Sequence, residues 1–500
     1  MSNWLIGADI GSSGLKAALV HPEQGVVAIS EQSYSMHRPH PDWAENYAED
    51  WYWALARAIP EVLHAANVSA SEVRALCVAG QRDIAVLLDD AGRVLSPVIH
   101  WTDRRHPEST ERIYDSIGRE KLVNTSGTLP IPGLVLPNLM WTKENQPEIW
   151  KQVKHALMPK DYIAYRLTGD FGTDPTGPTR SILNDWQKKD WSQELCDLAG
   201  IPREILPDVK YEPWEVRGEL GVAAHELSLL PHTLLIAGGG DDPSAALGSG
   251  VINPGDVSVG TGSSMSWRAV AESAQFDPTG LVGLMPHVVP GRYLHEIVAV
   301  GSGTTLRWLR GAFGAGAQYA DLIADSSDVR RGSDGLLCFP YVEGASVPVQ
   351  DDHARATFDG ISGHHSLPHF VRSTLEGIAY QYPALLELLQ TRGLTVDRLT
   401  ISDGEARSRE WNQIKADVLN KPITPALRVQ APSIGSAILA GIGSGVFADA
   451  QAGIDALVEV APTIFPTKDG TSEYSRLRRA WEERRETLYP QFAQPTTAAK

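Results

Sequence analysis

Residues Thr233–Gly250 read TLLIAGGGDDPSAALGSG, and residues Val251–Trp267 continue as VINPGDVSVGTGSSMSW. The apolar run Leu234–Ile236 predicts a buried strand, which leads into three glycines and then into the adjacent acids Asp241 and Asp242. Glycine permits close approaches of the backbone that a Cβ forbids. The stretch therefore predicts two carboxylates at the end of a buried strand, facing whatever lies beyond the edge of its sheet.

A second strand-like run, Asp256–Val259, leads into the loop Gly260-Thr261-Gly262-Ser263-Ser264. The backbone N–H groups and hydroxyls of such a loop suit phosphate oxygens. Together with an acid that can accept a proton from a hydroxyl, this loop favours phosphoryl transfer. Either loop alone is more typical of a surface turn or of an ordinary Gly/Ser loop, so the interpretation rests on their combination with a third turn.

The N-terminal segment predicts three strands joined by tight turns, and its first hairpin reads WLIGADI, GSSG and LKAALV from Trp4 onward. ADIGSSG is similar to the glycine-rich fingerprint of dinucleotide-binding folds, with Asp9 in place of the first glycine. Such a fold needs a helix directly after the glycines, but His21, Pro22 and Gly25 end the next segment after a few residues. A β-hairpin is therefore expected, which argues against NAD binding.

The turn of this hairpin contains candidate ligands for a metal ion and for phosphate. Asp9, at a strand end, is a candidate Mg²⁺ ligand that acts through water. Ser12, Ser13 and the amides of the turn are candidates for binding phosphate, and Lys16 can offset its charge. The alternative is a plain Gly/Ser hairpin with a surface lysine.

The third glycine turn follows the strand-like run LTI and reads SDGEARS from Ser402 to Ser408. A strand-to-helix turn of this kind can hold a nucleoside and a phosphate at the helix N-terminus. The alternative is an ordinary helix start with Ser408 as its N-cap. The chain has no GxxxxGK[ST] motif, which excludes a P-loop enzyme. The stretches MHRPHP and His364-His365 are expected to be solvated loops rather than metal sites, because they lack partners at ligand spacing.

Length and composition describe an ordinary globular protein with two large domains: 500 residues, 42% hydrophobic and 21% charged. The net charge of −17 argues against nucleic acid or an anionic membrane as the main partner. Cys77, Cys196 and Cys338 have no metal-binding spacing and are expected to be reduced core thiols. Because no signal-peptide pattern and no membrane-length apolar run is found, a soluble, cytoplasmic protein is expected.

A domain boundary is expected near residue 245, which divides the chain into domains 1–245 and 246–490 and a frayed tail, 491–500. After this boundary VSVGTGSSMSWRAV resembles DIGSSGLKAALV of the N-terminus, which favours a weak internal repeat of two similar α/β domains. Mainly helical structure is predicted between residues 106 and 210. Individual helices are predicted at residues 50–66, 369–389, 411–419, 434–447 and 474–489.

The three glycine turns and the segments between them, in this order and spacing, resemble the FGGY carbohydrate kinases of the actin-like ATPase superfamily. The matching segments are DIGSSGLKA, WAENYAEDWYWAL, GQRDIAVLLDDAGRVLSPVIHWTDRR, LMPKDYIAYRLTG, GGGDDPSAALGSG, GDVSVGTGSS and DGEARSREWNQIKADVLNKPI. The resemblance extends over nearly the whole chain, and the xylulokinase group is the most similar within the family. The resemblance implies two ribonuclease H-like α/β domains flanking a catalytic cleft, the first on the sugar side and the second on the nucleotide side.

The resemblance further implies phosphorylation of a small sugar, a ketopentose such as D-xylulose, by ATP with Mg²⁺, and a homodimer is common in the family. Asp241 would be the general base and Asp9 the metal ligand. The residues expected to bind the nucleotide and its phosphates are Ser12, Ser13, Lys16, Gly260, Thr261, Gly262, Gly404, Glu405 and Gln413.

Three residues expected on the substrate side, Arg82, Asp83 and Asp242, depart from the xylulokinase pattern, whereas Gln81 keeps it. Gln81, Arg82 and Asp83 stand where xylulokinases have Gln-Met-His, and Asp242 stands where they have Asn. An Arg–acid pair at this point is similar to glycerol kinases, where it binds substrate hydroxyls. The alternatives are therefore a kinase of another polyol or sugar, such as glycerol, erythritol or ribulose, or an Arg82–Asp83 ion pair without a ligand.

Glu405 is a further departure, because the adenosine turn of the family has a glycine at this position. In the family the backbone of this turn contacts the nucleotide, so a side chain at this position is expected to weaken ATP binding. The presence of Glu405 and Asp242 leaves open the alternative that the protein binds a sugar or a nucleotide but has lost catalytic turnover. The retained Asp9, Asp241 and Thr261 argue against that alternative.

Overall fold

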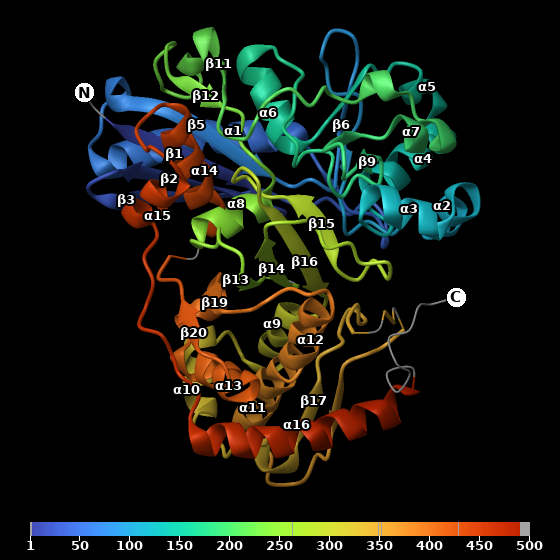
Figure 1. Cartoon of the computed structure of the whole chain (residues 1–500), viewed down its shortest axis with the longest axis vertical. Helices are drawn as coiled ribbons and strands as arrows, with labels where there is room; N and C mark the ends of the chain where they lie inside the picture. The colour runs from blue at the N-terminus through green and yellow to red at the C-terminus, as the bar shows by residue number, and fades with distance from the viewer. Residues whose placement is uncertain (1–2, 263, 349, 352, 429, 491–500) are drawn as a thin grey trace. The chain divides into compact units, whose positions relative to one another are not determined.

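The computed structural model describes residues 3–262, 264–348, 350–351, 353–428 and 430–490 (Figure 1). The chain forms two compact units: the first is built on a six-stranded sheet, and the second on the strands β13, β14, β16, β19 and β20. The first unit contains the chain through Ile252 together with Leu284–Leu294 and Gln430–Val458. The second contains Asn253–Gly283, the segment from His295 up to residue 428, and the chain from Glu459 onward.

The sheet of the first unit has the strand order β11-β12-β5-β1-β2-β3. Strands β1 and β2 pair antiparallel, so the predicted hairpin is confirmed, whereas β1, β5 and β12 run parallel to one another. This sheet has no βαβ unit at the DIGSSG turn, because β2 follows that turn directly. The strands are β1 (Trp4–Ile10), β2 (Gly14–His21), β3 (Gly25–Ser33), β5 (Val73–Gly80), β11 (Val216–Glu219) and β12 (Leu234–Ile236).

Helices cover both faces of this sheet (Figure 1). Alternate residues of β1 point to opposite faces, as the strand period of two requires. Ile6 and Ala8 pack in one cluster with Trp51 of α1 (Ala48–Ala66), while Leu5 packs with Ile434 of α14 (Ala431–Gly443) in another. All seven residues of β1 are buried, which explains its continuous apolar run.

A mostly helical region lies between β5 and β11 and has its own apolar cluster. The prediction of mainly helical structure there is confirmed. Lys160 and Arg217 form a buried network with Asp161, in which Lys160 Nζ lies 2.8 Å and Arg217 Nη1 3.0 Å from Asp161 Oδ1. The helices are α2 (Ser109–Ile117), α3 (Arg119–Ser126), α4 (Val135–Asn145), α5 (Pro147–Trp150), α6 (Pro159–Thr168) and α7 (Gln193–Ala199). Short strands lie beside them: β4 (Glu45–Asn46), β6 (Val86–Leu88), β7 (Val98–Ile99), β8 (His155–Leu157), β9 (Asn184–Asp185) and β10 (Asp190–Trp191).

The second unit repeats the pairing pattern of the first. Strand β13 pairs antiparallel with β14 and parallel with β19, and β19 pairs parallel with β20. This is the arrangement that β1 has with β2, β5 and β12, so the two glycine-turn hairpins occupy equivalent places in their sheets. The strands of this sheet in the second unit are β13 (Asp256–Thr261), β14 (Met265–Ala271), β16 (Tyr293–Ala299), β19 (Arg398–Ser402) and β20 (Ile423–Pro425). A separate two-stranded sheet is formed by β17 (Leu337–Phe339) and β18 (Thr357–Asp359), and β15 (Gly283–Pro286), most of which belongs to the first unit, precedes β16 in the chain.

Helices were predicted in the second unit at 369–389, 411–419 and 474–489; the last two are confirmed by Arg409–Leu419 and Lys468–Leu488, whereas Ser302–Phe313 and Tyr319–Ser326 were not predicted. A single helix was expected at 369–389, but the chain forms α11 and then α12, with Pro383 in the first turn of α12. Proline has no N–H to continue the preceding helix, so a break at this point is expected on physical grounds. The helices are α9 (Ser302–Phe313), α10 (Tyr319–Ser326), α11 (Leu367–Ala379), α12 (Tyr382–Thr391), α13 (Arg409–Leu419) and α16 (Lys468–Leu488).

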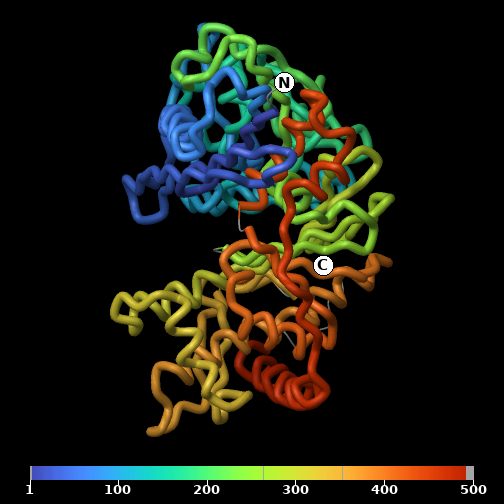
Figure 2. Tube along the Cα trace, turned by 90° about the vertical axis from the view of Figure 1, so that its left-hand side faces the viewer, coloured from blue at the N-terminus to red at the C-terminus, as the bar shows by residue number. Residues whose placement is uncertain are grey.

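The expected boundary near residue 245 lies close to Ile252, where the chain first passes between the units. One contiguous second domain, 246–490, does not describe the segments Leu284–Leu294 and Gln430–Val458, which belong to the first unit. Figure 2 traces this last segment, with α14 and α15 (Ala450–Leu457), back to the N-terminal strands. The predicted frayed tail, 491–500, lies outside the described residues.

The packing of α14 on α8 (Asp241–Gly248) makes a testable prediction. A Cβ on Gly435 would lie 1.9 Å from the backbone oxygen of Ser244, and a backbone atom cannot move aside as a side chain can. Gly435→Val should therefore lower the free energy of unfolding by about 3 kcal/mol, at the upper end of overpacking costs. Urea denaturation measures this loss.

Gly218→Ala, in the same unit, is the matched control, because its Cβ would meet Thr168 Cγ2 at an ordinary 3.6 Å. Equal stabilities of the two variants would contradict the close packing of α14 on α8.

Candidate active site

Three polar segments follow neighbouring strands of the first unit at the same edge of the sheet. In the parallel register Ile10 of β1 lies beside Gly80 of β5, and Gly80 forms a bridge with Gly240. The residues that come next in each segment therefore emerge together at the carboxyl ends of the strands. In open α/β sheets this edge is where ligands bind.

Asp241 and Asp242 form the first turn of α8, directly after Gly240. A Cβ on Gly240 would lie 2.1 Å from Cδ of Arg82, so the glycine leaves room for that side chain. The N-terminus of a helix favours negative charge. The glycines of the quoted stretch thus bring two acids to the sheet edge and admit an arginine beside them.

Arg82 holds both acids. Its Nε donates to Asp241 Oδ1 at 3.2 Å, and its Nη2 donates to Asp242 Oδ2 at 2.5 Å. Nη1 donates to Thr179 Oγ1 at 3.2 Å, and the residue is only 1% exposed. A buried arginine whose donors are engaged in this way is an orienting group, and removing one partner of such a pair costs several kcal/mol.

The pKa of the Asp241 carboxyl is raised to about 7. Burial is the main cause, the neighbouring negative charge of Asp242 adds to it, and Arg82 opposes both. The Asp241 side chain still keeps 30% of its surface exposed, so another molecule can reach it. A carboxylate that exchanges its proton near neutral pH is suited to general acid–base chemistry.

A loop between α6 and β9 supports this arrangement. Its role could not be predicted, because its residues show only the composition of a loop. Thr176 Oγ1 accepts a hydrogen bond from Gly240 N at 2.7 Å, which fixes the backbone before Asp241. Arg180 Nε donates to Asp83 Oδ1 at 2.8 Å. The structure thus places Arg82 and Asp83 each in an ion pair with another residue of the first unit.

Two further polar side chains near this edge are buried without a hydrogen-bond partner among the described residues. Neither the oxygen nor the nitrogen of the Gln81 amide has one, and Gln81 is 3% exposed. His100, which was not expected in the site, accepts from Thr102 N at Nδ1, and its Nε2 has no such partner. Burial lowers the pKa of His100 to about 4, so the ring is neutral at pH 7 and Nε2 carries its hydrogen. Both side chains can bind a polar ligand.

The hairpin turn places its candidates around the end of β1. Asp9 is 8% exposed and lies opposite Lys16 in the register of β1 and β2. Ser12 Oγ accepts a hydrogen bond from Trp101 Nε1 at 3.2 Å, whereas Ser13 is exposed at the tip of the turn. The turn closes on itself through Gly11 N and Gly14 O, 3.0 Å apart.

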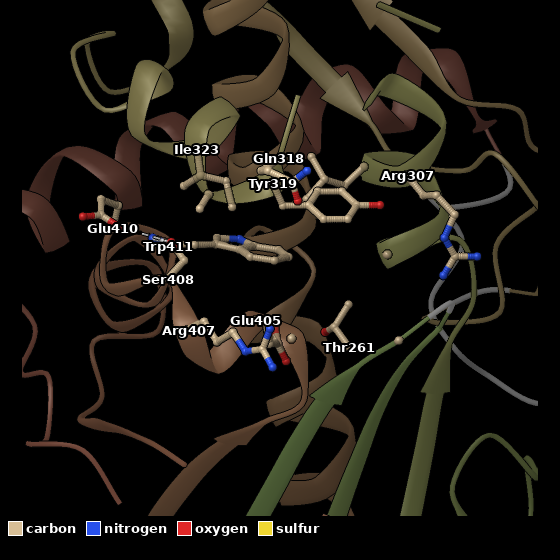
Figure 3. A pocket seen from close by; sticks show the side chains of 15 residues that line it. Thr261, Arg307, Gln318, Tyr319, Ile323, Glu405, Arg407, Ser408, Glu410 and Trp411 are labelled. Atoms are coloured by element: carbon tan, nitrogen blue, oxygen red, sulfur yellow. Dashed lines mark hydrogen bonds between the residues drawn. The ribbon is translucent and has the colours of Figure 1, made fainter. Parts of the chain in front are cut away.

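The second unit contains a cavity of about 450 Å³ (Figure 3). Ile323 and Tyr319 lie across it from Arg407 and Thr261, with the Trp411 ring between them (Figure 3). One part of its wall is therefore apolar and aromatic, and another is formed by glycine and hydroxyl groups. Besides these five residues the cavity is lined by Gly262, Gly303, Leu306, Arg307, Gln318, Ala320, Gly404, Glu405, Ser408 and Glu410.

Four of the residues expected to bind the nucleotide line this cavity: Thr261, Gly262, Gly404 and Glu405. Gly260 precedes them in β13 and makes room for Asp403, whose Oδ2 would lie 2.2 Å from a Cβ there. Gln413 is not among the lining residues, and its Nε2 donates to Asp417 Oδ1 at 3.1 Å. Ser263 of the same loop lies outside the described residues.

The remaining predictions concern thiols, metals and membranes. The three cysteines are free and buried, as expected. Among the described residues no group of three or more His, Cys, Asp or Glu side chains has the geometry of a metal site. In that part of the chain, no helix combines the length and the apolar character needed to span a membrane.

Known proteins are similar to this chain over most of its length. Residues 4–248 match the N-terminal domain of the FGGY family of carbohydrate kinases, and residues 255–444 match its C-terminal domain. The xylulose kinase of Lactococcus lactis subsp. lactis is 29% identical over 484 residues, which cover 96% of each chain. The glycerol kinase of Thermococcus kodakarensis is 26% identical and covers 97% of this chain and 96% of its own.

Solved structures agree with the fold described above. The crystal structure of xylulose kinase from Rhodospirillum rubrum superimposes with a TM-score of 0.87 at 29% identity and covers 98% of this chain and 100% of its own. The two α/β units therefore have the actin-like ATPase fold of these kinases. The chain belongs to the FGGY family of carbohydrate kinases and is a xylulokinase-like phosphotransferase that acts on a sugar.

Proposed function

We propose that this kinase transfers the γ-phosphoryl group of ATP to a hydroxyl of a ketopentose, D-xylulose, with Asp241 as the general base. The observation that carries the proposal is the pKa of about 7 of Asp241, at the sheet edge where ligands bind. Its carboxylate takes the proton of the sugar hydroxyl as the hydroxyl oxygen attacks phosphorus. The bond between the phosphorus and the leaving oxygen breaks, and ADP carries the electrons of that bond away.

Arg82 and Asp242 tune this base in opposite directions. Arg82 lowers the pKa of Asp241, and Asp242 raises it. Because Arg82 bonds to Asp241 Oδ1, it also fixes the orientation of the carboxylate before the substrate arrives. A base with a pKa near the working pH combines a large deprotonated fraction with useful basicity.

Mg²⁺ fits the residues around Asp9. Mg²⁺ keeps most of its waters in proteins and needs only one or two carboxylates in addition to substrate phosphates, so a group of three protein ligands is not required. Asp9 offers one hard oxygen donor at a strand end, nearly buried at 8% exposure. When bound there, the ion would neutralise phosphate charge; Ser12 and Lys16 would contact the phosphate oxygens from the same hairpin.

The cavity of the second unit is the proposed nucleotide site. Its aromatic and aliphatic side, with Trp411 and Ile323, suits a base, and its other side, with Thr261, Gly262 and Gly404, suits phosphates and ribose. Gln413 was expected to contact the nucleotide by resemblance, whereas Ser408 and Arg407 are the residues of that segment that line the cavity.

The similarity to xylulose kinases and the partners of Arg82 both support a ketose rather than glycerol. Xylulose kinases match at 29% identity and a glycerol kinase at 26%. A polyol kinase of the glycerol type would use Arg82 and Asp83 to bind substrate hydroxyls. Here Arg82 is 1% exposed and engaged with two acids, and Asp83 is paired with Arg180. The Gln81 amide and Nε2 of His100, which have no hydrogen-bond partner among the described residues, are better placed to recognise the sugar.

Replacing the base tests the mechanism. Asp241→Asn should lower sugar-dependent ADP release at least about a thousandfold, because the amide cannot accept the proton and general-base catalysis contributes factors of 10²–10⁴. ADP binding, measured by calorimetry, should remain, since the nucleotide cavity is built by other residues.

Asp197→Asn is the control for this variant, because Asp197 is exposed on α7 and its side chain bonds only to Gln193 among the contacts described. It should keep wild-type activity. Wild-type turnover in Asp241→Asn would show that Asp241 is not the general base.

A substrate panel tests the identity of the sugar. ADP release with Mg-ATP should be fastest with D-xylulose among D-xylulose, L-xylulose, D-ribulose, L-ribulose, glycerol, erythritol and gluconate. A preference for glycerol or erythritol would favour the polyol alternative. If none of the seven compounds stimulates ADP release while ADP still binds, the result would favour a binding protein that has lost turnover.

A further inference from the structure

Glu405 does not project its charge into the nucleotide cavity as the sequence led us to expect. Its carboxylate forms an ion pair with Lys415 of α13, and both side chains are fully buried. Tyr382 of α12 donates its hydroxyl to Glu405 Oε2 at 3.2 Å. Lys415 Nζ also donates to Asn412 Oδ1 at 3.2 Å and lies 4.0 Å from the centre of the Trp411 ring.

The ion pair lies behind the turn Gly404–Arg407, which lines the cavity. Asn412 Nδ2 donates to the carbonyl oxygens of Glu405 and Ala406, each at 3.2 Å. The residue before the turn, Asp403, has φ 58° and ψ −161°, a conformation that is costly for any residue with a Cβ. A strained backbone persists only where its surroundings hold it, and these buried contacts of Glu405 supply that support.

Thr261 connects the pair to the phosphate side of the cavity. Its hydroxyl makes no well-formed hydrogen bond to a described residue, but it lies close enough to Glu405 to lower the pKa of that carboxyl group. A threonine hydroxyl has one hydrogen to donate, and both a carboxylate and a phosphate accept. An ionised Glu405 without a cation would therefore compete for this hydrogen and repel a phosphate.

Lys415 removes this conflict. Burial raises the pKa of Glu405 and lowers that of Lys415, and the charge of each partner opposes the shift of the other. Paired, they present no net charge to the cavity wall.

We propose that Lys415 cancels the charge of Glu405 behind Thr261, so that the cavity accepts a nucleoside polyphosphate. The inference rests on the proposed nucleotide site. It explains how this chain tolerates an acid where a glycine is expected.

The test compares three variants: Lys415→Met, Glu405→Gln and the double variant. The probe is Mg-ADP, titrated calorimetrically without sugar, together with the KM values for ATP and for the sugar. Lys415→Met leaves an uncompensated acid behind Thr261 and should weaken ADP binding at least about tenfold, which corresponds to 1.4 kcal/mol. Glu405→Gln should weaken it less than about threefold, and the double variant should return to within about threefold of the wild type. The KM for the sugar should not change.

Arg372→Met is the matched control. Arg372 forms another buried ion pair in the second unit, 2.9 Å from Glu376 Oε1, and neither residue lines the cavity. It should lower stability and leave ADP affinity unchanged.

Equal losses in Lys415→Met and Glu405→Gln, or no recovery in the double variant, would overturn the charge-cancelling role. If Lys415→Met does not fold, the double variant decides alone: a loss of ADP affinity of tenfold or more overturns the proposal. Wild-type affinity in all three variants would overturn the role of the pair but leave the nucleotide site standing. Absence of ADP binding by the wild-type chain would overturn both.

Discussion

The contact of Arg82 with Asp241 and Asp242 is the interaction on which the first unit's chemistry depends. Two adjacent carboxylates cannot both stay ionised at low cost in a site that is partly shielded from water. One buried guanidinium bonds to both acids and is itself held by Thr179. The balance of burial, repulsion and this one cation leaves Asp241 with a pKa of about 7, where a base is useful. The glycine before the acids is what lets the arginine approach.

Much of the fold could be predicted from the sequence, because it depends on local patterns. The strand-like runs that form β1 and β2, the turn residues between them and the early Pro22 exclude a crossover helix at DIGSSG, and the hairpin is present. Ser408 is the N-cap of α13, as its position predicted, and accepts from Trp411 N at 3.1 Å. The internal repeat, weak in sequence, is clear in the shared strand pairing of the two sheets.

The features that could not be predicted are those that join distant parts of the chain. Arg82 and Asp241 are 159 positions apart, and their neighbours in sequence do not show that they meet. The return of Gln430–Val458 to the first unit is likewise a matter of tertiary packing, which no local pattern reports. Glu405 was expected to hinder nucleotide binding, since its ion pair with Lys415 could not be foreseen. Lys415 lies on the next helix, and in sequence it looks like an ordinary helical lysine.

The pH dependence of kcat/KM for the best sugar substrate, in the wild type and in Asp242→Asn, tests the central claim most directly. Because the base must be deprotonated, activity should rise with pH through about 7 in the wild type. Loss of the negative charge of Asp242 should lower the pKa of Asp241, so the rise should move to lower pH in the variant. A rise near pH 4 in the wild type, or one that stays in place in Asp242→Asn, would contradict the account.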